Sequence, residues 1–311
     1  MTSLPLISVI MPCFNGANFL KRSIDSVFAQ SYTHIELIVV NDGSTDISLE
    51  ILNTIQDSRL VIINQKNTGV CKARNNALIQ AKGEFIAFLD ADDTWNPECL
   101  FKLHQAFLVQ PNAVLAYCGW QNIGLSGGNG APYIPPDYQK LNKLESIFEN
   151  CCWPIHATLT RRFAIDKIGG FDESLLTSED FLLWLKIASQ YVICLVPEVL
   201  AHYHFHGETQ ATQNKEMMAI NHWLAQKSFL QDNPSIRHQF DSKHLAKLMH
   251  GGLLHRGYNC YWKRDLKTAR TIFKAVMKTG YGSLRDWKYM LPALLPYSMH
   301  VALLKKMGSL V

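Results

Sequence analysis

The chain has 311 residues, 48% of them hydrophobic and 18% charged, which suffices for one large domain with its own core and an appendage. This composition excludes an intrinsically disordered protein, and no run of roughly 18 uninterrupted apolar residues predicts a membrane-spanning helix. The formal net charge of +4 is uneven, because residues 240–311 hold 13 Lys or Arg against 3 Asp or Glu. Such a basic segment predicts either an anionic partner or simply solvated helix faces.

Strands and helices are predicted to alternate along the first part of the chain. Buried apolar runs indicate strands at 6–11, 35–40, 60–64 and 85–89, and helical spacing indicates helices at 18–30, 48–56 and 70–81. This alternation is typical of an α/β fold with a mostly parallel sheet flanked by helices. Further on we expect helices at 97–109 and 137–150, and strands at 113–117, 192–195 and 199–203, the last two at a sheet edge.

The same pattern predicts the domain organisation. We expect a first domain at 1–214, followed by a helical region at 215–311. The Gly- and Pro-rich stretch 124–136 predicts a mobile loop, either a lid or a plain surface excursion.

The compartment is inferred from the cysteines and the N-terminus. The eight cysteines lack CxxC spacing and mostly lie in apolar runs, which predicts buried thiols in a reducing compartment. The first apolar stretch has no basic region before it and runs directly into Pro12 and Asn15, so no signal peptide is predicted. We therefore expect a cytoplasmic protein.

Three carboxylates follow the apolar run 85–89, at Asp90, Asp92 and Asp93. Clustered like charges repel, and desolvation adds to their cost, so stability alone does not explain them. Hard oxygen ligands suit Mg²⁺ or Mn²⁺, ions that share their remaining positions with water and substrate phosphates. The alternative is that the acids cap the helix expected after Pro97, which could be the whole role of Asp93.

Other polar residues follow neighbouring strands in the same way. Pro12 to Asn15, Asp42 and Asp90 to Asp92 all come at strand ends, where parallel sheets bind their ligands, so one crevice could hold them. The chain contains neither GxGxxG nor GxxxxGK[ST], so phosphates would be held by metal and cationic side chains.

Several blocks of sequence occur in the order known from one family. ISVIMPCFN, VVNDGSTD, NTGVCKARNNAL, FLDADD, GGFDESLLTSEDFLLWLKI and HYHFH together resemble the family 2 glycosyltransferases over roughly residues 5–210. The resemblance implies that residues 1–214 form a catalytic domain with an A-type fold. Its Rossmann-like nucleotide-binding half would lie at about 1–118 and its acceptor half at about 119–214. It also implies inverting transfer of a sugar from a nucleotide-sugar, in particular a UDP-sugar, to a hydroxyl of a glycan or lipid-linked acceptor. Mn²⁺ or Mg²⁺ is the implied cofactor, surface polysaccharide synthesis the implied setting, and no nucleic acid is expected.

The resemblance also assigns donor contacts. Phe14 stands where a tyrosine is common, which keeps a stacking face. Asp42 would accept a hydrogen bond from the base, which suits the N3–H of uracil. In the sequence NDGS it could instead only stabilise a turn. Arg74 would reach the ribose or phosphates, or else pair with a nearby acid. Asp92 would be a direct metal ligand. The implied donor-binding residues are Pro12, Phe14, Asn15, Asp42, Arg74, Asp90 and Ala91.

On the acceptor side, Ser178 is a good helix N-cap, and acids in the first turn favour a helix start. The resemblance instead places Asp180 as general base, with Glu179 beside it. His202, His204 and His206 alternate and would share one face of a strand, which would suit zinc. The family pattern Tyr-Arg-x-His implies that His206 alone is the metal or diphosphate histidine, and that His204 replaces an arginine.

The basic C-terminal region is predicted to be a packed helical appendage. Gly257, Tyr261, Ala269 and Phe273 resemble one tetratricopeptide-like helical pair without a second copy. Residues 288–307 could lie on an anionic membrane surface, at the inner face of the plasma membrane, or merely cap the domain. Rival functions are a metal-dependent nucleotidyltransferase and a non-catalytic glycan-binding protein.

Overall fold

The computed structural model describes residues 4–124, 128–207, 210 and 213–306. The chain forms two compact units, residues 1–210 and residues 211–311, and the predicted boundary after residue 214 lies slightly further along the chain. Among the helices of these described ranges, none combines the length and the apolar character needed to cross a bilayer. All eight cysteines are free thiols, and Cys151 is the one that is exposed.

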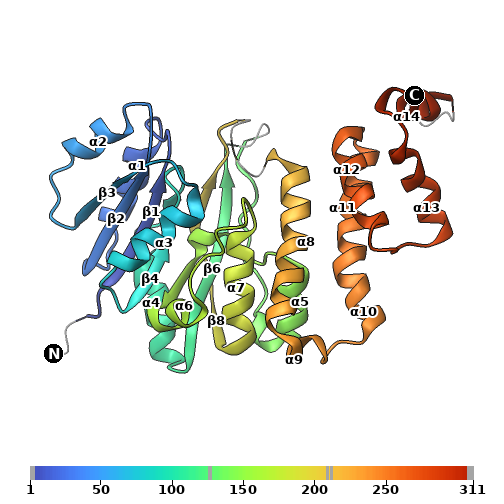
Figure 1. Ribbon diagram of the computed structural model, residues 1–311. Helices are drawn as coiled ribbons and strands as arrows, with labels where there is room; N and C mark the ends of the chain where they lie inside the picture. Colours follow the sequence, from blue (N-terminus) through green and yellow to red (C-terminus); the bar gives the residue numbers. More distant parts are fainter. Residues whose placement is uncertain (1–3, 125–127, 208–209, 211–212, 307–311) are drawn as a thin grey trace. The chain divides into compact units, whose positions relative to one another are not determined.

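One eight-stranded sheet forms the centre of the first unit, in the order β3-β2-β1-β4-β7-β6-β8-β5 (Figure 1). Neighbouring strands from β3 to β4 are parallel, as are β6 and β8, whereas β7 and β5 run antiparallel to their neighbours. The predicted α/β class is confirmed, with a parallel part from β3 to β4 and a mixed part from β7 to β5. The strands are β1 (Ile7–Cys13), β2 (Ile35–Asp42), β3 (Leu60–Gln65), β4 (Phe85–Phe88), β5 (Thr94–Trp95), β6 (Ala113–Ile123), β7 (Thr158–Arg161) and β8 (Val192–His204).

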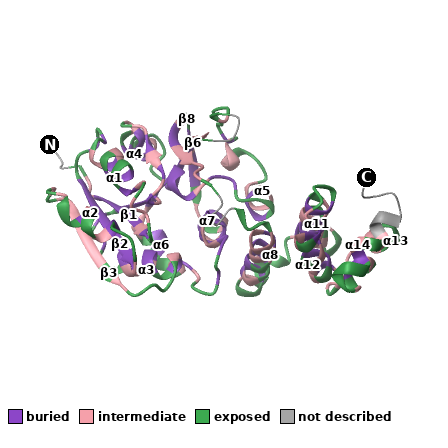
Figure 2. Ribbon diagram, turned by 90° about the horizontal axis from the view of Figure 1, so that it is seen from above, coloured by how far each residue is buried: buried purple, intermediate pink, exposed green. Residues whose placement is uncertain are grey.

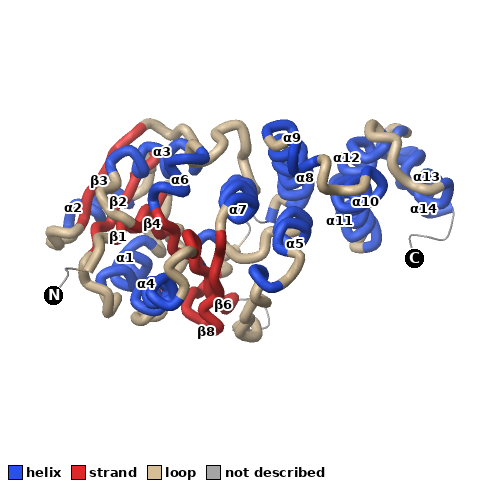
Figure 3. Tube along the Cα trace, turned by 90° about the horizontal axis from the view of Figure 1, so that it is seen from below, coloured by secondary structure: helices blue, strands red, loops and turns tan. Residues whose placement is uncertain are grey.

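Helices cover both faces of this sheet. Helices α1 and α4 lie on one face and α3, α6 and α7 on the other (Figure 3), and strands β1, β2 and β4 between them are almost entirely buried (Figure 2). The unbroken apolar runs seen in the sequence are therefore strands that are buried by helices on both faces of the sheet. The helices are α1 (Leu20–Phe28), α2 (Ser48–Thr54), α3 (Val70–Gln80), α4 (Cys99–Val109), α5 (Lys143–Glu149), α6 (Arg162–Ile168) and α7 (Glu179–Gln190), with 3₁₀ turns η1 (Tyr138–Lys140) and η2 (Ile155–Ala157).

The two strands predicted at a sheet edge are one strand, β8. Its register against β6 jumps from Cys118 opposite Val196 to Gly119 opposite Val199, so Pro197 and Glu198 bulge out of the ladder and divide the sequence pattern in two. The edge prediction is wrong for 199–203, where the two-residue β5 pairs antiparallel with Ala201 and His202, whereas residues 192–195 pair with β6 alone among the described strands. This pairing sets Thr94 opposite His202 and so brings the segment after β4 against the histidine segment.

The second unit contains helices and no strand in the residues that the structure describes. Helix α10, a π-helical turn η4 and helix α11 follow one another without a non-helical residue, and α11 then packs against α12 over a buried apolar core. The elements are α8 (Lys215–Asp232), α9 (Pro234–Arg237), α10 (Ser242–Ala246), η4 (Lys247–Gly251), α11 (Gly252–Trp262), α12 (Leu266–Met277), α13 (Leu284–Met290), the 3₁₀ turn η5 (Leu291–Leu294) and α14 (Tyr297–Lys306).

Gly257 permits the close approach of α11 and α12, in keeping with the predicted helical pair. A Cβ atom at this position would lie 2.8 Å from Cε1 of Phe273, whose ring is fully buried. We expect Gly257→Ala to lower the free energy of unfolding by ~1–2 kcal/mol, because the overpacking cost of roughly 1–3 kcal/mol exceeds the gain of about 0.5–1 kcal/mol in helix propensity. Urea unfolding would measure this, with the same change at Gly252, which meets no atom within 4 Å, as the control. Equal stability of both variants would contradict the packing argument.

Candidate active site

The carboxyl ends of β2, β1 and β4, where the sequence predicts a crevice, lie side by side. These strands are adjacent and parallel, and Cys13 at the end of β1 pairs with Asn41 near the end of β2. The loops that leave the three strands therefore share one edge of the sheet, as predicted.

Asn15 holds the loop after β1 against the loop after β2. Its backbone is left-handed, at a φ of 51°, a conformation that Asn tolerates better than most residues. Its Oδ1 accepts from the N–H of Thr45 at 2.8 Å, and its own N–H donates to Ser44 Oγ at 3.0 Å. Phe14 beside it is 52% exposed, so its ring offers an open face. Pro12 is a residue of β1 itself.

Asp42 clamps the loop that precedes α3. Its side chain is buried, and its carboxylate accepts from Gln65 Nε2 at 2.7 Å and from the N–H groups of Thr68 and Gly69, both at 2.9 Å. The local turn contact that was the alternative role for Asp42 is instead made by Asn41, whose Oδ1 accepts from the N–H of Ser44. Thr68 Oγ1 also donates to Asp42 Oδ1, at 3.5 Å, whereas Gly69 is the one donor to Oδ2 among the described residues, so an acceptor position for a ligand remains on Oδ2.

Arg74 joins the carboxylate segment after β4 to the start of α7. Its guanidinium is 3% exposed and donates to Asp90 Oδ1 at 2.6 Å and to Glu179 Oε1 at 2.7 Å. Its Cζ lies 5.3 Å from the centre of the Phe171 ring. Burial alone would lower the pKa of Arg74, but the two carboxylates raise it. The pairing with a nearby acid, the alternative left open by the sequence, is therefore present in the structure.

Removing this guanidinium should destabilise the protein, because Asp90 and Glu179 would then face each other uncompensated. Breaking a buried pair typically costs 3–5 kcal/mol, and the partial exposure of Asp90 places Arg74→Met near ~3 kcal/mol. The matched control is Arg59→Met, whose pair with Asp57 is about a quarter exposed and should cost at most ~1 kcal/mol. Urea unfolding compares the two, and equal losses would contradict the bridging role.

Asp92 and His206, the two predicted metal ligands, meet although 114 residues separate them. His206 Nε2 lies 2.7 Å from Asp92 Oδ2, and the two side chains are 19% and 30% exposed. No third His, Cys, Asp or Glu among the described residues completes a metal-binding group with them. Two protein ligands with open positions fit Mg²⁺ or Mn²⁺, which usually retain water and take phosphate oxygens, better than a closed zinc site.

Helix α1 and the end of β8 fix this pair from outside. Arg22 donates to the carbonyl of Asp92 at 2.8 Å, and the Phe19 ring lies against the His206 ring with centres 4.2 Å apart. Gln210 donates to the carbonyl of His204 and accepts from the N–H of His206. Sequence patterns gave no signal for these three positions, because only the tertiary fold brings them to the site.

Asp93 does not cap helix α4, which begins at Cys99. It is fully buried, its Oδ1 accepts from the N–H of His204 at 2.9 Å, and its Oδ2 lies 2.9 Å from Nδ1 of buried His156. Burial raises the pKa of Asp93 to about 6. Burial would lower the pKa of His156, but Asp93 more than offsets this and raises it. The capping prediction is wrong for Asp93, which instead ties the carboxylate segment to β8.

His204 and His202 do not join His206 as ligands. His204 Nε2 lies 2.9 Å from Thr94 Oγ1, and burial, aided by the charge of Arg22, lowers the pKa of His204 to about 4. Burial also lowers the pKa of His202. His204 is thus neutral near pH 7 and carries no charge of the kind that an arginine would supply.

Asp180 lies in the first turn of α7, one residue beyond Glu179. Its Oδ1 accepts from the N–H of Phe181 at 2.7 Å, and Cys151 Sγ lies 3.9 Å from its Oδ2. Burial, together with repulsion from Glu179, raises the pKa of Asp180 to about 7. Ser178 occupies the N-cap position as predicted, but its backbone is left-handed and its side chain makes no capping hydrogen bond. A carboxyl group with a pKa near neutrality can exchange protons at working pH.

The described residues of the 124–136 loop run back along β6. Tyr133 exchanges two backbone hydrogen bonds with Trp120, and the N–H of Gly130 donates to the carbonyl of Asn122. Residues 125–127 lie outside the described residues, and the choice between lid and surface excursion stays a prediction.

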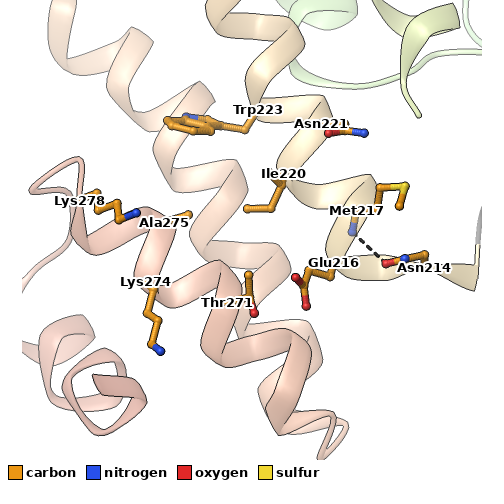
Figure 4. Close-up of a pocket in the computed structure, with 10 residues that line it drawn as sticks. All are labelled: Asn214, Glu216, Met217, Ile220, Asn221, Trp223, Thr271, Lys274, Ala275 and Lys278. Atoms are coloured by element: carbon orange, nitrogen blue, oxygen red, sulfur yellow. Dashed lines mark hydrogen bonds between the residues drawn. The ribbon is translucent and has the colours of Figure 1, made fainter. Parts of the chain in front are cut away.

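A second recess, of about 690 Å³, lies between α8 and α12 in the helical unit (Figure 4). Ile220 and Trp223 line it from α8, and Ala275 with Lys274 and Lys278 from α12. Its single carboxylate, Glu216, has no histidine or second acid beside it among the lining residues, so the recess lacks the groups of a catalytic centre.

Comparison with known proteins supplies independent information. The family model described as Glycosyl transferase family 2 matches residues 8–169. An uncharacterized glycosyltransferase of Rickettsia typhi is 31% identical over 76% of this chain and 77% of its own length. A putative teichuronic acid biosynthesis glycosyltransferase of Bacillus subtilis is 28% identical over 71% of this chain and 86% of its length. A chondroitin synthase of Pasteurella multocida is 26% identical over 71% of this chain, which spans only 23% of that protein.

Solved structures share the fold. TarS of S. aureus, residues 1–349 in complex with UDP-GlcNAc, gives a TM-score of 0.65 at 21% identity over 87% of this chain and 81% of that chain. The mannosyltransferase PcManGT of Pyrobaculum calidifontis, in complex with GDP-Man and Mn²⁺, gives a TM-score of 0.58 at 19% identity, over 99% of this chain and 85% of that chain. At these identities the likeness shows the A-type glycosyltransferase fold.

Proposed function

Because this chain belongs to glycosyltransferase family 2, we propose that it transfers a sugar from a UDP-sugar to a hydroxyl of a glycan or lipid-linked acceptor, with inversion and with Mn²⁺ or Mg²⁺. The setting that we propose is surface polysaccharide synthesis, a suggestion supported by the names of the Bacillus and Pasteurella relatives. The family assignment argues against a nucleotidyltransferase.

The observation that carries the proposal is the meeting of Asp92 with His206 at 2.7 Å. The two residues are 114 positions apart in the sequence, and Asp92 belongs to the same segment after β4 as Asp90. A carboxylate and an imidazole side by side, both reachable by solvent, would hold a divalent ion together with diphosphate oxygens. When bound, such an ion would offset the charge that develops on the leaving diphosphate. A relic site would not need to retain this pair.

Asp180 would act as the general base. Its carboxylate would take the proton of the acceptor hydroxyl while the hydroxyl oxygen forms its bond to the anomeric carbon and the bond to the nucleoside diphosphate breaks on the opposite face. A pKa of about 7 leaves a large fraction of Asp180 ionised at neutral pH and still basic enough to accept a proton. Arg74 would position this base, because it holds the preceding residue Glu179.

The proposal that the nucleotide is UDP is supported by residues in the loops that follow β1 and β2. The exposed ring of Phe14 would stack on the base, and the remaining acceptor position of Asp42 would receive N3–H of uracil. Asp90, with Ala91 beside it, would face the ribose. The buried position of Asp42 means that the base must come close to the clamped loop of Thr68 and Gly69.

We further propose that the protein is cytoplasmic and associates with the inner face of the plasma membrane. The basic C-terminal region, with 13 Lys or Arg against 3 acids in residues 240–311, supports this proposal.

The test is thermal stabilisation by nucleotide-sugars, with and without Mn²⁺. A ligand at about 100 times its Kd stabilises the folded state by ~2.7 kcal/mol, which shifts Tm measurably. We expect a UDP-sugar to stabilise the protein only when Mn²⁺ or Mg²⁺ is present. Stabilisation by a GDP- or TDP-sugar, and not by a UDP-sugar, would contradict the assignment of UDP as the nucleotide. If no nucleotide-sugar stabilises the protein, the proposed transfer is wrong.

A further inference from the structure

The C-terminal part of the helical unit exposes a run of large apolar side chains. Leu284, Leu291 and Leu294 are 93%, 49% and 61% exposed, and Tyr297 and Met299 follow them on α14. Single exposed apolar residues are ordinary on a soluble protein, whereas a group of them marks an interaction surface. In the rest of this unit, as far as the structure describes it, the only other exposed large apolar side chains are Leu224 and Trp262.

The three leucines lie on one side of a continuous helix. Helix α13 runs directly into the 3₁₀ turn η5, since Met290 and Leu291 both keep a right-handed helical backbone. Spacings of four, three and three residues from Leu284 through position 288 to Leu291 and Leu294 fall on one face. The opposite face carries Met290 and Ala293, which are fully buried in the helical core. The helix therefore has two apolar faces, and only one of them is used in the core.

The outward face is also cationic. Arg285 and Lys288 are exposed beside the leucines, and residues 287–311 contain no Asp or Glu at all. The one acid of α13, Asp286, is engaged in hydrogen bonds within the helical unit. It accepts from the N–H and the hydroxyl of Ser283 and from the hydroxyl of Tyr258. Leucines with Lys and Arg, and without acids, match acyl chains beneath anionic headgroups.

We propose that this face, called the leucine face and made of Leu284, Lys288, Leu291 and Leu294 with Arg285 at its edge, inserts into the surface of a bilayer that contains anionic lipid. The inference deepens the proposed function, on which it rests for its meaning. A transferase held in this way meets acceptors that are carried on a lipid in that surface, so the acceptor class narrows to lipid-linked glycans. The attachment itself belongs to the helical unit and can be measured without any transfer.

The test uses the full chain and vesicles of phosphatidylcholine containing about one third phosphatidylglycerol. The variant is the triple change Leu284→Ser, Leu291→Ser and Leu294→Ser. Its matched control, Ile79→Ser, Leu108→Ser and Val109→Ser, alters side chains that are 78%, 62% and 79% exposed in the first unit. We expect the control to sediment with the vesicles like the wild type. The leucine-face variant should lose at least about a hundredfold in partition coefficient, since each leucine gives up most of the burial that insertion provides.

A second variant tests the charges and remains informative if the triple change unfolds the protein. Arg285→Glu with Lys288→Glu should lower binding to the anionic vesicles at least about tenfold and leave binding to pure phosphatidylcholine vesicles nearly unchanged. Equal sedimentation of the leucine-face variant and its control overturns the proposal. So does a halved mass of that variant in light scattering without any change in vesicle binding, because the face would then bind a second copy of this chain.

The same samples separate this inference from the proposed function. Stabilisation by UDP-sugar and Mn²⁺ should be equal in all variants. The wild type could bind vesicles through the leucine face and yet be stabilised by no nucleotide-sugar. In that case the proposed sugar transfer is wrong and the proposed membrane attachment is supported. If nucleotide-sugar stabilises the protein and the leucine face does not bind vesicles, the attachment fails alone.

Discussion

Replacing Asp180 by Asn is expected to slow sugar transfer about 10²–10⁴-fold while leaving donor affinity nearly unchanged, because a positioned proton acceptor contributes a factor of this size. The amide has the size of the carboxylate and can still accept from the N–H of Phe181, so the first turn of α7 should keep its geometry. Transfer from the UDP-sugar, or its slow hydrolysis where no acceptor is at hand, measures the rate. Asp166→Asn, which changes an exposed acid on α6, is the control.

The pH dependence gives a second view of the same residue. Only ionised Asp180 can accept a proton, so the wild-type rate should rise with pH and level off above about 7, where its pKa lies. The folded-state pKa is raised above that of the unfolded chain, so folding is favoured by protonated Asp180. The stability that this residue contributes is therefore present below about pH 4 and is lost as the pH rises through 7. Asp180→Asn should remove that loss, which thermal unfolding at pH 5 and pH 8 would show.

Two outcomes would contradict the assignment of Asp180. Near-normal transfer by the folded Asn variant would reduce the residue to a helix-terminal acid. A covalent sugar adduct trapped on the enzyme would mean a protein nucleophile and retention of configuration, which is a different reaction course.

Asp92→Ala should remove metal-dependent donor binding, and turnover with it. Loss of a residue that merely orients a metal ligand typically costs 10–100-fold in affinity, so loss of the ligand itself should cost at least about a hundredfold. The fold should survive, because the change relieves repulsion among Asp90, Asp92 and Asp93 and leaves His206 partly exposed to water. Titration calorimetry of UDP with and without Mn²⁺ measures the effect.

His206→Ala should reproduce that loss, whereas His202→Ala, four residues earlier within β8, should not. An unchanged affinity of the Asp92 variant for UDP in Mn²⁺ would show that the metal is held elsewhere. Donor affinity thus separates Asp92, which should lose it, from Asp180, which should not.

The sheet and its helices were predictable because their signals are local. Strands buried on both faces must be apolar throughout, so β1, β2 and β4 are visible as short runs in the sequence. The predicted helix at 137–150 is divided into η1 and α5. That division had a signal, since Asn142 and Glu145 have the spacing of a capping box, and the Asn142 side chain accepts from the N–H of Glu145.

Features that depend on pairing between distant segments could not be predicted. Strand β5 has two residues and forms only because β8 lies beside it. The periodicity of the sequence therefore predicts neither β5 nor its pairing with Ala201 and His202 of β8. The same holds for the site. Three carboxylates in four residues indicated a metal, but their division into a pair with Arg74, a pair with His206 and a buried pair with His156 follows from three different elements packed against one segment.

The buried Arg74 bridge bears on how such enzymes can recombine. Arg74 comes from α3, in the half that carries the nucleotide loops, and Glu179 from α7, in the half assigned to the acceptor. A chimera that joins the first half of this chain to the second half of a relative inherits one partner from each parent. Where the relative lacks an acid at the position of Glu179, the guanidinium keeps only Asp90, and its buried N–H group that donates to Glu179 loses its acceptor. Exchange of acceptor specificity between relatives should therefore succeed most often when crossover points keep α3 and the start of α7 together.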